Sequence, residues 1–107
     1  VRKLADQGLL ARIAEADTDS RVRHAAVAKL ADQVVLARVA RHDADKGVRI
    51  AAIYEMTDQA VLGEIATTDG DAQMRWCAVH ELSDPIVLQR IAREDASDSV
   101  RREAAAG

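Results

Sequence analysis

The chain has 107 residues, of which 49% are hydrophobic and 31% charged, and its formal net charge is −3. This size and composition are typical of one ordered domain, and the acidic balance argues against a general nucleic-acid binder, because phosphate affinity comes from Lys and Arg. Only 2% of the residues are aromatic and none is Phe, so small aliphatic side chains must form the core. The sole cysteine, Cys77, cannot form an intramolecular disulfide, and no apolar run reaches membrane-spanning length. We therefore expect a cytoplasmic protein that does not enter a membrane.

A repeat of 26 residues organises the chain. The complete copies, which align without a gap, are residues 22–47, 48–73 and 74–99. Partial copies at the two ends are residues 1–21 and 100–107. Tandem repeats of this length are typical of solenoids, in which each unit buries the apolar face of its neighbour. The sequence thus predicts one all-α repeat domain over the whole chain and, because the first copy starts midway, a fragment of a longer repeat protein.

From the N-terminus onward, the sequence first predicts the end of a helix over residues 1–5. It then predicts a second type of helix, here called helix B. Helix B is expected to begin after an aspartate, since Asp is a strong N-cap. Apolar residues follow at helical spacing, as in Leu36, Val39 and Ala40. Pro85 occupies the first helical position of the last copy, where proline is favoured. The capping aspartates are Asp6, Asp32, Asp58 and Asp84.

A second column of capping residues predicts the other helix of each repeat, here called helix A. These residues are Asp19, Asp45, Asp71 and Ser97. In the first complete repeat, helix A is expected to run from Ser20 to Ala31 with a broad apolar arc. Such an arc indicates that helix A is covered by its own helix B and by the next repeat. Val100 and Ala104 begin a helix A that no helix B follows, so end-to-end self-association is a further expectation.

The repeat consensus consists of a Val-Arg start, an Ala-Ala-Val centre, a Leu-x-Asp turn and an Ile-Ala-x-x-Asp close. This pattern resembles HEAT-like repeats, most nearly the short form of phycobilisome-lyase-type HEAT proteins and leucine-rich repeat variants. The resemblance covers essentially the whole chain and implies an α-solenoid, a scaffold that specifies no single chemistry. The iron–sulfur module of some leucine-rich repeat variants needs more cysteines than the chain has. Other relatives imply two alternatives, a HEAT-like nucleic-acid-binding or DNA-repair protein and an accessory subunit of a tetrapyrrole-handling lyase.

One arginine column runs along helix A inside its apolar arc, beside an aspartate column at the end of helix B. We expect a structural ladder of charge-assisted hydrogen bonds between the two columns, the alternative being a row of anion-binding sites. The members are Arg23, Arg49, Arg75 and Arg101, together with Asp17, Asp43, Asp69 and Asp95. The Asp-x-Asp pairs at these turns are interpreted as helix caps. A calcium loop that began at Asp69 would need a glutamate where His80 stands.

Helix A also carries the only aromatic side chains of the chain. Trp76 and His80 are one helical turn apart, and Ile50 and Tyr54 occupy the same columns one repeat earlier. Because Trp and Tyr are enriched in binding hot spots, these four residues predict a protein-binding patch on the outer surface of helix A. The alternative is that Ile50 and Trp76 close a seam between repeats.

Helix B predicts a second candidate surface, a mildly basic ridge on its outward columns. Its basic members are Arg12, Arg38, Arg41, Arg90 and Arg93. The ridge could receive an acidic segment of a partner, although Glu15 and Glu64 interrupt it. The alternative is a plain solvated face.

No combination of residues in the sequence predicts catalysis. Nucleophile–base pairs, paired carboxylates and Gly-rich phosphate loops are missing. His24, His42 and His80 share neither a column nor a metal-ligand spacing, and Cys77 is expected to be a small buried residue. The predicted function is therefore a scaffold that is not an enzyme, holds no metal or cofactor, and binds another protein.

Overall fold

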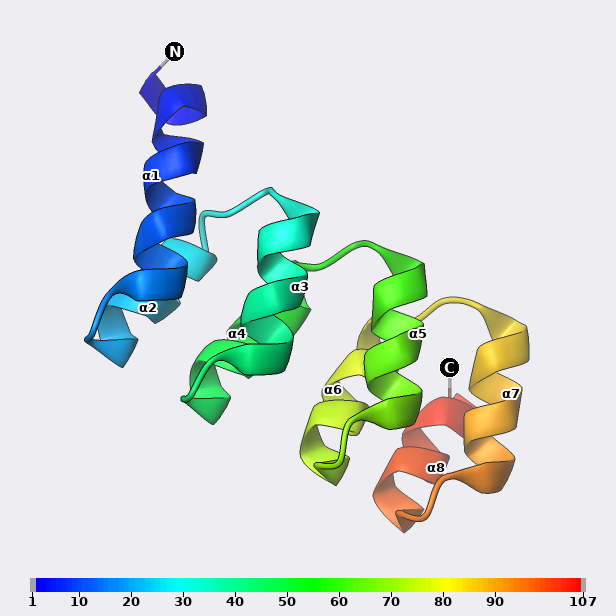
Figure 1. Ribbon diagram of the computed structural model, residues 1–107. Coiled ribbons are helices and arrows are strands. Elements are labelled where there is room, and N and C mark those ends of the chain that lie inside the picture. The colour runs from blue at the N-terminus through cyan, green and yellow to red at the C-terminus, as the bar shows by residue number, and fades with distance from the viewer. Residues whose placement is uncertain (1, 107) are drawn as a thin grey trace. The chain divides into compact units, whose positions relative to one another are not determined.

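The structure, a computed structural model, describes the backbone of residues 2–106 and the side chains of residues 7–106 (Figure 1). This part of the chain forms eight α-helices and no strand, so the predicted all-α class is confirmed. The helices are α1 (Arg2–Ala16), α2 (Ser20–Val27), α3 (Gln33–His42), α4 (Lys46–Glu55), α5 (Gln59–Thr68), α6 (Ala72–Glu81), α7 (Pro85–Glu94) and α8 (Asp98–Ala106). They fall into two compact units, Val1–Met56 and Thr57–Gly107. No helix described here is long and apolar enough to cross a bilayer.

Aspartate caps start most of the helices, as the two capping columns predict. Asp32 has extended backbone (φ −70°, ψ 109°), and its carboxylate accepts hydrogen bonds from the N–H groups of Val34 and Val35. These bonds satisfy two of the donors that the first helical turn leaves unpaired. The other capping aspartates that accept such bonds are Asp19, Asp45, Asp58, Asp71 and Asp84. Pro85 follows Asp84 at the start of α7, also as predicted.

Helix α1 differs from the prediction, because it runs unbroken through Asp6. At Asp32, Asp58 and Asp84 the backbone is extended and a new helix begins, whereas at Asp6 the backbone continues as helix, so the predicted break there is wrong.

The helices of type A end earlier than predicted. Helix α2 stops at Val27 rather than Ala31, and the N–H of Leu30 then bonds to the carbonyl of Val27 at 3.0 Å in a tight turn. This turn buries Leu30, which is 5% exposed. The chain must then become extended to place Asp32 as the next cap, so the helix cannot continue to Ala31.

Each unit consists of two hairpins in which a helix B is followed by a helix A. In the first unit α1 packs on α2 and α3 on α4, and α2 lies against α4. In the second unit α5 packs on α6 and α7 on α8, and α6 lies against α8 (Figure 1). Val100 and Ala104 are consequently 1% and 3% exposed. The expectation that α8 lacks a covering helix B is wrong, because the covering helix precedes helix A in the chain.

The core of each unit is made of aliphatic side chains of modest size. In the first unit Leu36, Val48 and Ile53 are fully buried, and in the second Leu62 and Met74 are. Several alanines on both helix types are also 0% exposed, which lets the helix axes approach closely. They are Ala14, Ala40, Ala52, Ala66 and Ala78.

Candidate functional site

The turns between helix B and helix A are built by the aspartate that ends helix B. In each copy its carboxylate accepts the N–H of the residue two positions further on, at 2.8 Å. This local bond fixes the direction in which the chain enters the next helix. The pairs are Asp17 with Asp19, Asp43 with Asp45, Asp69 with Asp71, and Asp95 with Ser97.

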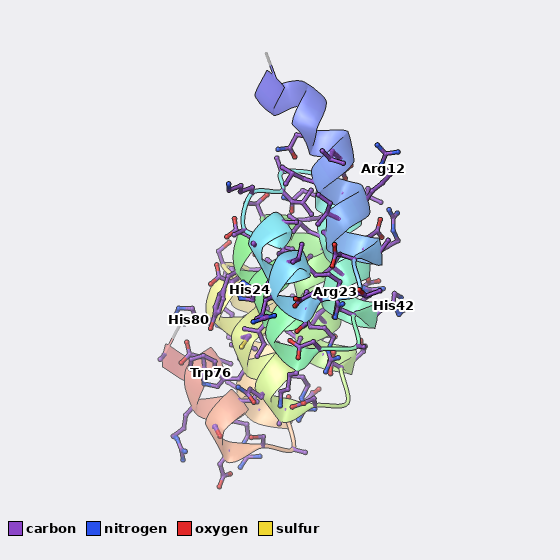
Figure 2. The ribbon with its side chains drawn as sticks, turned by 90° about the vertical axis from the view of Figure 1, so that its left-hand side faces the viewer. Arg12, Arg23, His24, His42, Trp76 and His80 are labelled. Atoms are coloured by element: carbon purple, nitrogen blue, oxygen red, sulfur yellow. The ribbon has the colours of Figure 1, made fainter. Side chains whose placement is uncertain are left out.

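Arg23, which is labelled in Figure 2, lies on α2. Its hydrogen bonds connect two of these turns in the first unit. Its Nε and Nη2 donate to the Asp43 carboxylate at 2.8 and 3.1 Å, and its Nη1 donates to the Asp17 carbonyl at 2.8 Å. The Arg49 guanidinium donates to the Asp43 carbonyl at 2.6 Å. The side chains of Arg23 and Asp43 are only 13% and 5% exposed. This bidentate geometry leaves little of either charge available to an outside ion.

The second unit repeats the arrangement with the corresponding residues. Arg75 Nε and Nη2 donate to the Asp95 carboxylate at 2.9 and 3.2 Å, and Arg75 Nη1 donates to the Asp69 carbonyl at 2.8 Å. Arg101 donates to the Asp95 carbonyl at 2.6 Å and also pairs with Asp98. Within each unit the structure brings together residues of the two columns in the manner of a structural ladder.

The surroundings of Asp43 and Asp95 favour the charged form of these two carboxyl groups. Burial acts to raise the pKa of Asp43, but the hydrogen bonds from Arg23 and the Asp45 N–H, with the charges of Arg23 and Arg49, outweigh it and lower this pKa. The pKa of Asp95 is lowered in the same way, against burial, chiefly by the hydrogen bond from Arg75. The hydrogen bond to Asp43 in turn raises the pKa of Arg23.

A glutamine clamp closes the hairpins, and the sequence analysis missed it. Gln7 at the start of the helix B segment donates through Nε2 to the Lys29 carbonyl at 3.0 Å and accepts the Ala31 N–H at 3.0 Å. Gln59 holds the Glu81 carbonyl at 3.2 Å and the Ser83 N–H at 2.9 Å. The available signal was a glutamine directly after the capping aspartate in three copies, with Pro85 in the fourth.

The predicted aromatic patch draws its members from both units. Ile50 and Tyr54 lie on α4 of the first unit, where Tyr54 is 48% exposed. Trp76 and His80 lie on α6 of the second unit (Figure 2). Their rings are stacked, with centroids 5.5 Å apart at an interplanar angle of 8°. His80 Nδ1 lies 2.9 Å from Glu103 Oε2, and this hydrogen bond raises the pKa of His80. His80 therefore links α6 to α8 through Glu103.

The predicted basic ridge carries a neutralising ion pair in the first unit. Arg12, Arg38 and Arg41 are all exposed there, and Figure 2 shows Arg12 pointing outward from α1. Arg38, however, donates from Nε and Nη2 to the Glu15 carboxylate at 2.7 and 3.1 Å. This pair lowers the pKa of Glu15, mainly through the hydrogen bond. A hollow of about 160 Å³ beside it is lined by Glu15, Arg38, Val39, His42 and Asp43.

The ridge in the second unit is more open. Arg90 and Arg93 are exposed on α7, and the Arg90 guanidinium has no ion-pair or hydrogen-bond partner within residues 7–106. The hollow beside Arg90 measures about 380 Å³. It is lined by Thr67, Arg90, Ile91, Glu94 and Asp95, the same repeat positions that line the hollow of the first unit.

No protein-family model, curated protein or solved structure matches the chain.

The remaining candidate residues lie apart from one another. His24 and His42 are exposed (Figure 2), and Cys77 is 3% exposed. Across residues 7–106 no three His, Cys, Asp or Glu side chains are grouped so that they could hold a metal ion. The candidate surfaces in each unit are thus the outward face of its helices B and the aromatic side chain of its helix A, Tyr54 on α4 in the first unit and Trp76 on α6 in the second.

Proposed function

We propose that the chain is a non-catalytic protein–protein interaction scaffold, built as an α-solenoid of HEAT-like repeats of 26 residues. The observation that carries this proposal is the return of the same polar contacts two repeats further along the chain. Arg23 with Asp43 becomes Arg75 with Asp95, and the clamp of Gln7 becomes that of Gln59. Contacts that recur at the repeat spacing support a modular scaffold, in which each copy is stabilised in the same way.

The polar side chains on these turns are used for internal structure, which leaves the exposed faces for binding. The helix B ridge supplies exposed arginines, and α4 supplies the exposed ring of Tyr54. Trp, Tyr and Arg are the residues most often found at protein-binding hot spots. The interleaved acidic residues and the pairing of Arg38 with Glu15 favour a protein partner over a nucleic acid, whose phosphates would meet carboxylates on the same ridge.

A difference in burial supports further stacking on the first hairpin. Val22 on α2 is 41% exposed, whereas Val48, at the same repeat position on α4, is 0% exposed because α2 covers it. Leu9 on α1 is 49% exposed. Another hairpin, from the same protein or from a second copy, would cover these side chains as α2 covers Val48.

Affinity capture from a lysate of the source cell, followed by mass spectrometry, tests the interaction function. The baits are the wild-type chain, the double variant Arg90→Gln/Arg93→Gln and the double variant Tyr54→Ala/Trp76→Ala. Circular dichroism first establishes that all three baits have equal helicity. We expect one protein to be enriched on the wild type and lost from one of the variants. Equal background on all three baits would reject the interaction function.

A further inference from the structure

The two hollows on the helix B ridge give a comparison within one molecule. Both are lined by residues at the same repeat positions, and both have an arginine in their lining, Arg38 in the first unit and Arg90 in the second. Their linings differ at three positions, which hold Glu15, Val39 and His42 in the first unit and Thr67, Ile91 and Glu94 in the second. The difference that removes a partner of the arginine is the one between Glu15 and Thr67.

In the first unit the arginine already holds a carboxylate. Glu15 on α1 presents both oxygens to Arg38 on α3, at 2.7 and 3.1 Å, and the two side chains are 33% and 53% exposed. This is the two-point geometry by which guanidinium groups recognise carboxylates. It leaves a hollow of about 160 Å³.

In the second unit the corresponding place is vacant. The Thr67 hydroxyl turns back to its own helix, where it donates to the Gly63 carbonyl at 2.8 Å and contacts the Glu64 carbonyl at 3.3 Å. Arg90 keeps a guanidinium without a partner in the described part of the chain, and the hollow enlarges to about 380 Å³.

We propose that Arg90 binds a carboxylate side chain from an acidic segment of a partner protein. This carboxylate occupies the place beside Arg90 that Glu15 occupies beside Arg38. The inference rests on the interaction function proposed above and names the chemistry that this surface recognises. Its geometric template is the Glu15–Arg38 pair.

The other lining residues favour a carboxylate over a phosphate. The Asp95 carboxylate is occupied by Arg75, and Glu94 lies one helical turn from Arg90 at the rim of the hollow. A doubly charged phosphate would meet both acidic groups at close range, whereas a singly charged carboxylate is repelled less. Ile91, which is 3% exposed, supplies an apolar wall for the methylene groups of a glutamate.

The test measures the binding of a fluorescein-labelled oligoglutamate peptide by fluorescence anisotropy at low salt, with oligoglutamine as the uncharged probe. Arg90→Gln removes the guanidinium, and Thr67→Glu supplies an internal carboxylate that should pair with it. We expect each change to weaken oligoglutamate binding by about fivefold, the effect of one well-formed surface charge pair. Glu94→Gln should tighten binding, because it removes the like charge at the rim.

Two matched variants separate this effect from bulk and from net charge. Thr67→Gln has the size of the glutamate without its charge and should keep the wild-type affinity. Arg12→Gln removes one exposed arginine from the same ridge, and its affinity should fall by less than about twofold. Wild-type affinity in Thr67→Glu, or an equal loss in Arg12→Gln and Arg90→Gln, would overturn the proposal.

The capture experiment keeps this inference distinct from the interaction function. If Thr67→Glu still captures the partner that the wild type captures, the scaffold function stands and the Arg90 site is rejected. If oligoglutamate binding depends on Arg90 while no bait captures a specific protein, the carboxylate chemistry of Arg90 stands, but the interaction function and the partner protein are rejected.

Discussion

The guanidinium of Arg23 binds the carboxylate of Asp43 through two parallel hydrogen bonds, 2.8 and 3.1 Å long, that join two consecutive hairpins. Both side chains are largely excluded from water. Replacement of either partner leaves the charge of the other without a partner at a site that water solvates poorly. A single substitution therefore lowers the free energy of unfolding by more than the net contribution of the pair.

We therefore expect Arg23→Ala to lower the free energy of unfolding by about 2 to 3 kcal/mol. Arg23→Lys should recover only part of this loss, because an ammonium group cannot form the two-point contact. Arg21→Ala is the matched control, since Arg21 is 89% exposed in its pair with Asp19 and its loss should change stability far less than the loss of Arg23. Urea denaturation followed by circular dichroism measures all three, and equal stability of Arg23→Ala and Arg21→Ala would contradict the structural role.

The lowered pKa values of Asp43 and Asp95 predict the acid sensitivity of the fold. A carboxyl group with a lower pKa in the folded state binds fewer protons there than in the unfolded chain, so its contribution is complete above the unfolded pKa of about 3.9 and is lost as the pH falls through the folded pKa. Asp43→Asn removes this contribution. The stability difference between the wild type and Asp43→Asn should be constant above about pH 5 and shrink below about pH 4. Urea titrations at several pH values measure it, and a difference that grows on acidification would refute the assignment.

The His80–Glu103 contact predicts a dependence of the opposite sign. Its hydrogen bond raises the pKa of His80, so the contribution is complete below the unfolded pKa of about 6.5 and is lost as the pH rises through the folded pKa. NMR titration of His80 should give a pKa above the reference value, and Glu103→Gln should lower it. Glu94→Gln, which removes a carboxylate that does not contact His80, is the control. A pKa that does not respond to Glu103→Gln would show that another group causes the shift.

The glutamine clamp predicts that substitution of an exposed residue lowers the stability of the fold. Gln59→Ala removes the contacts with Glu81 and Ser83 and should destabilise the chain by about 1 kcal/mol. Gln89→Ala changes an exposed glutamine in the middle of α7 and should have almost no effect. Thermal unfolding of both variants gives the comparison, and equal melting temperatures would mean that the clamp does not contribute to stability.

The difference in burial between Val22 and Val48 predicts that the same substitution lowers the free energy of unfolding by different amounts at the two positions. Val48→Ala removes fully buried methyl groups and should cost about 2 kcal/mol, whereas Val22→Ala should cost under about 0.5 kcal/mol. If another hairpin covers Val22 in solution, the cost of Val22→Ala will depend on protein concentration or on the length of the chain used. Analytical ultracentrifugation of the wild type and Val22→Asp reports that association directly.

The helices were predictable because capping is a local property of the sequence. Asp32 and Asp58 mark the starts of α3 and α5 without reference to any distant residue. The continuous α1 was not predictable in this way, because Asp6 is followed by Gln7 just as Asp32 is followed by Gln33, and this local sequence does not distinguish the two positions. The pairing of the helices into hairpins was also missed. Periodicity does not tell whether the helix B that covers α8 precedes it or follows it in the chain.

The candidate sites were predictable as columns but not as contacts. The sequence places Arg38 and Arg90 at the same repeat position, and only the structure distinguishes the paired guanidinium from the unpaired one. Long side chains have many rotamers, so their partners follow from the packing of the helices that carry them. The Gln7 clamp was missed because its partners are backbone groups, which have no signature in the sequence.

The clamp of Gln7 and the ion pair of Arg23 join residues that are no more than 24 positions apart in the chain. Interactions of this range are contained within a hairpin and its immediate neighbour. Duplication of one whole repeat in the gene would therefore add a complete set of contacts, and deletion would remove one, while the other contacts stay unchanged. The array can change length in evolution, or by engineering, without a new core having to be found each time, and the position of the Arg90 site within it can shift in steps of one repeat.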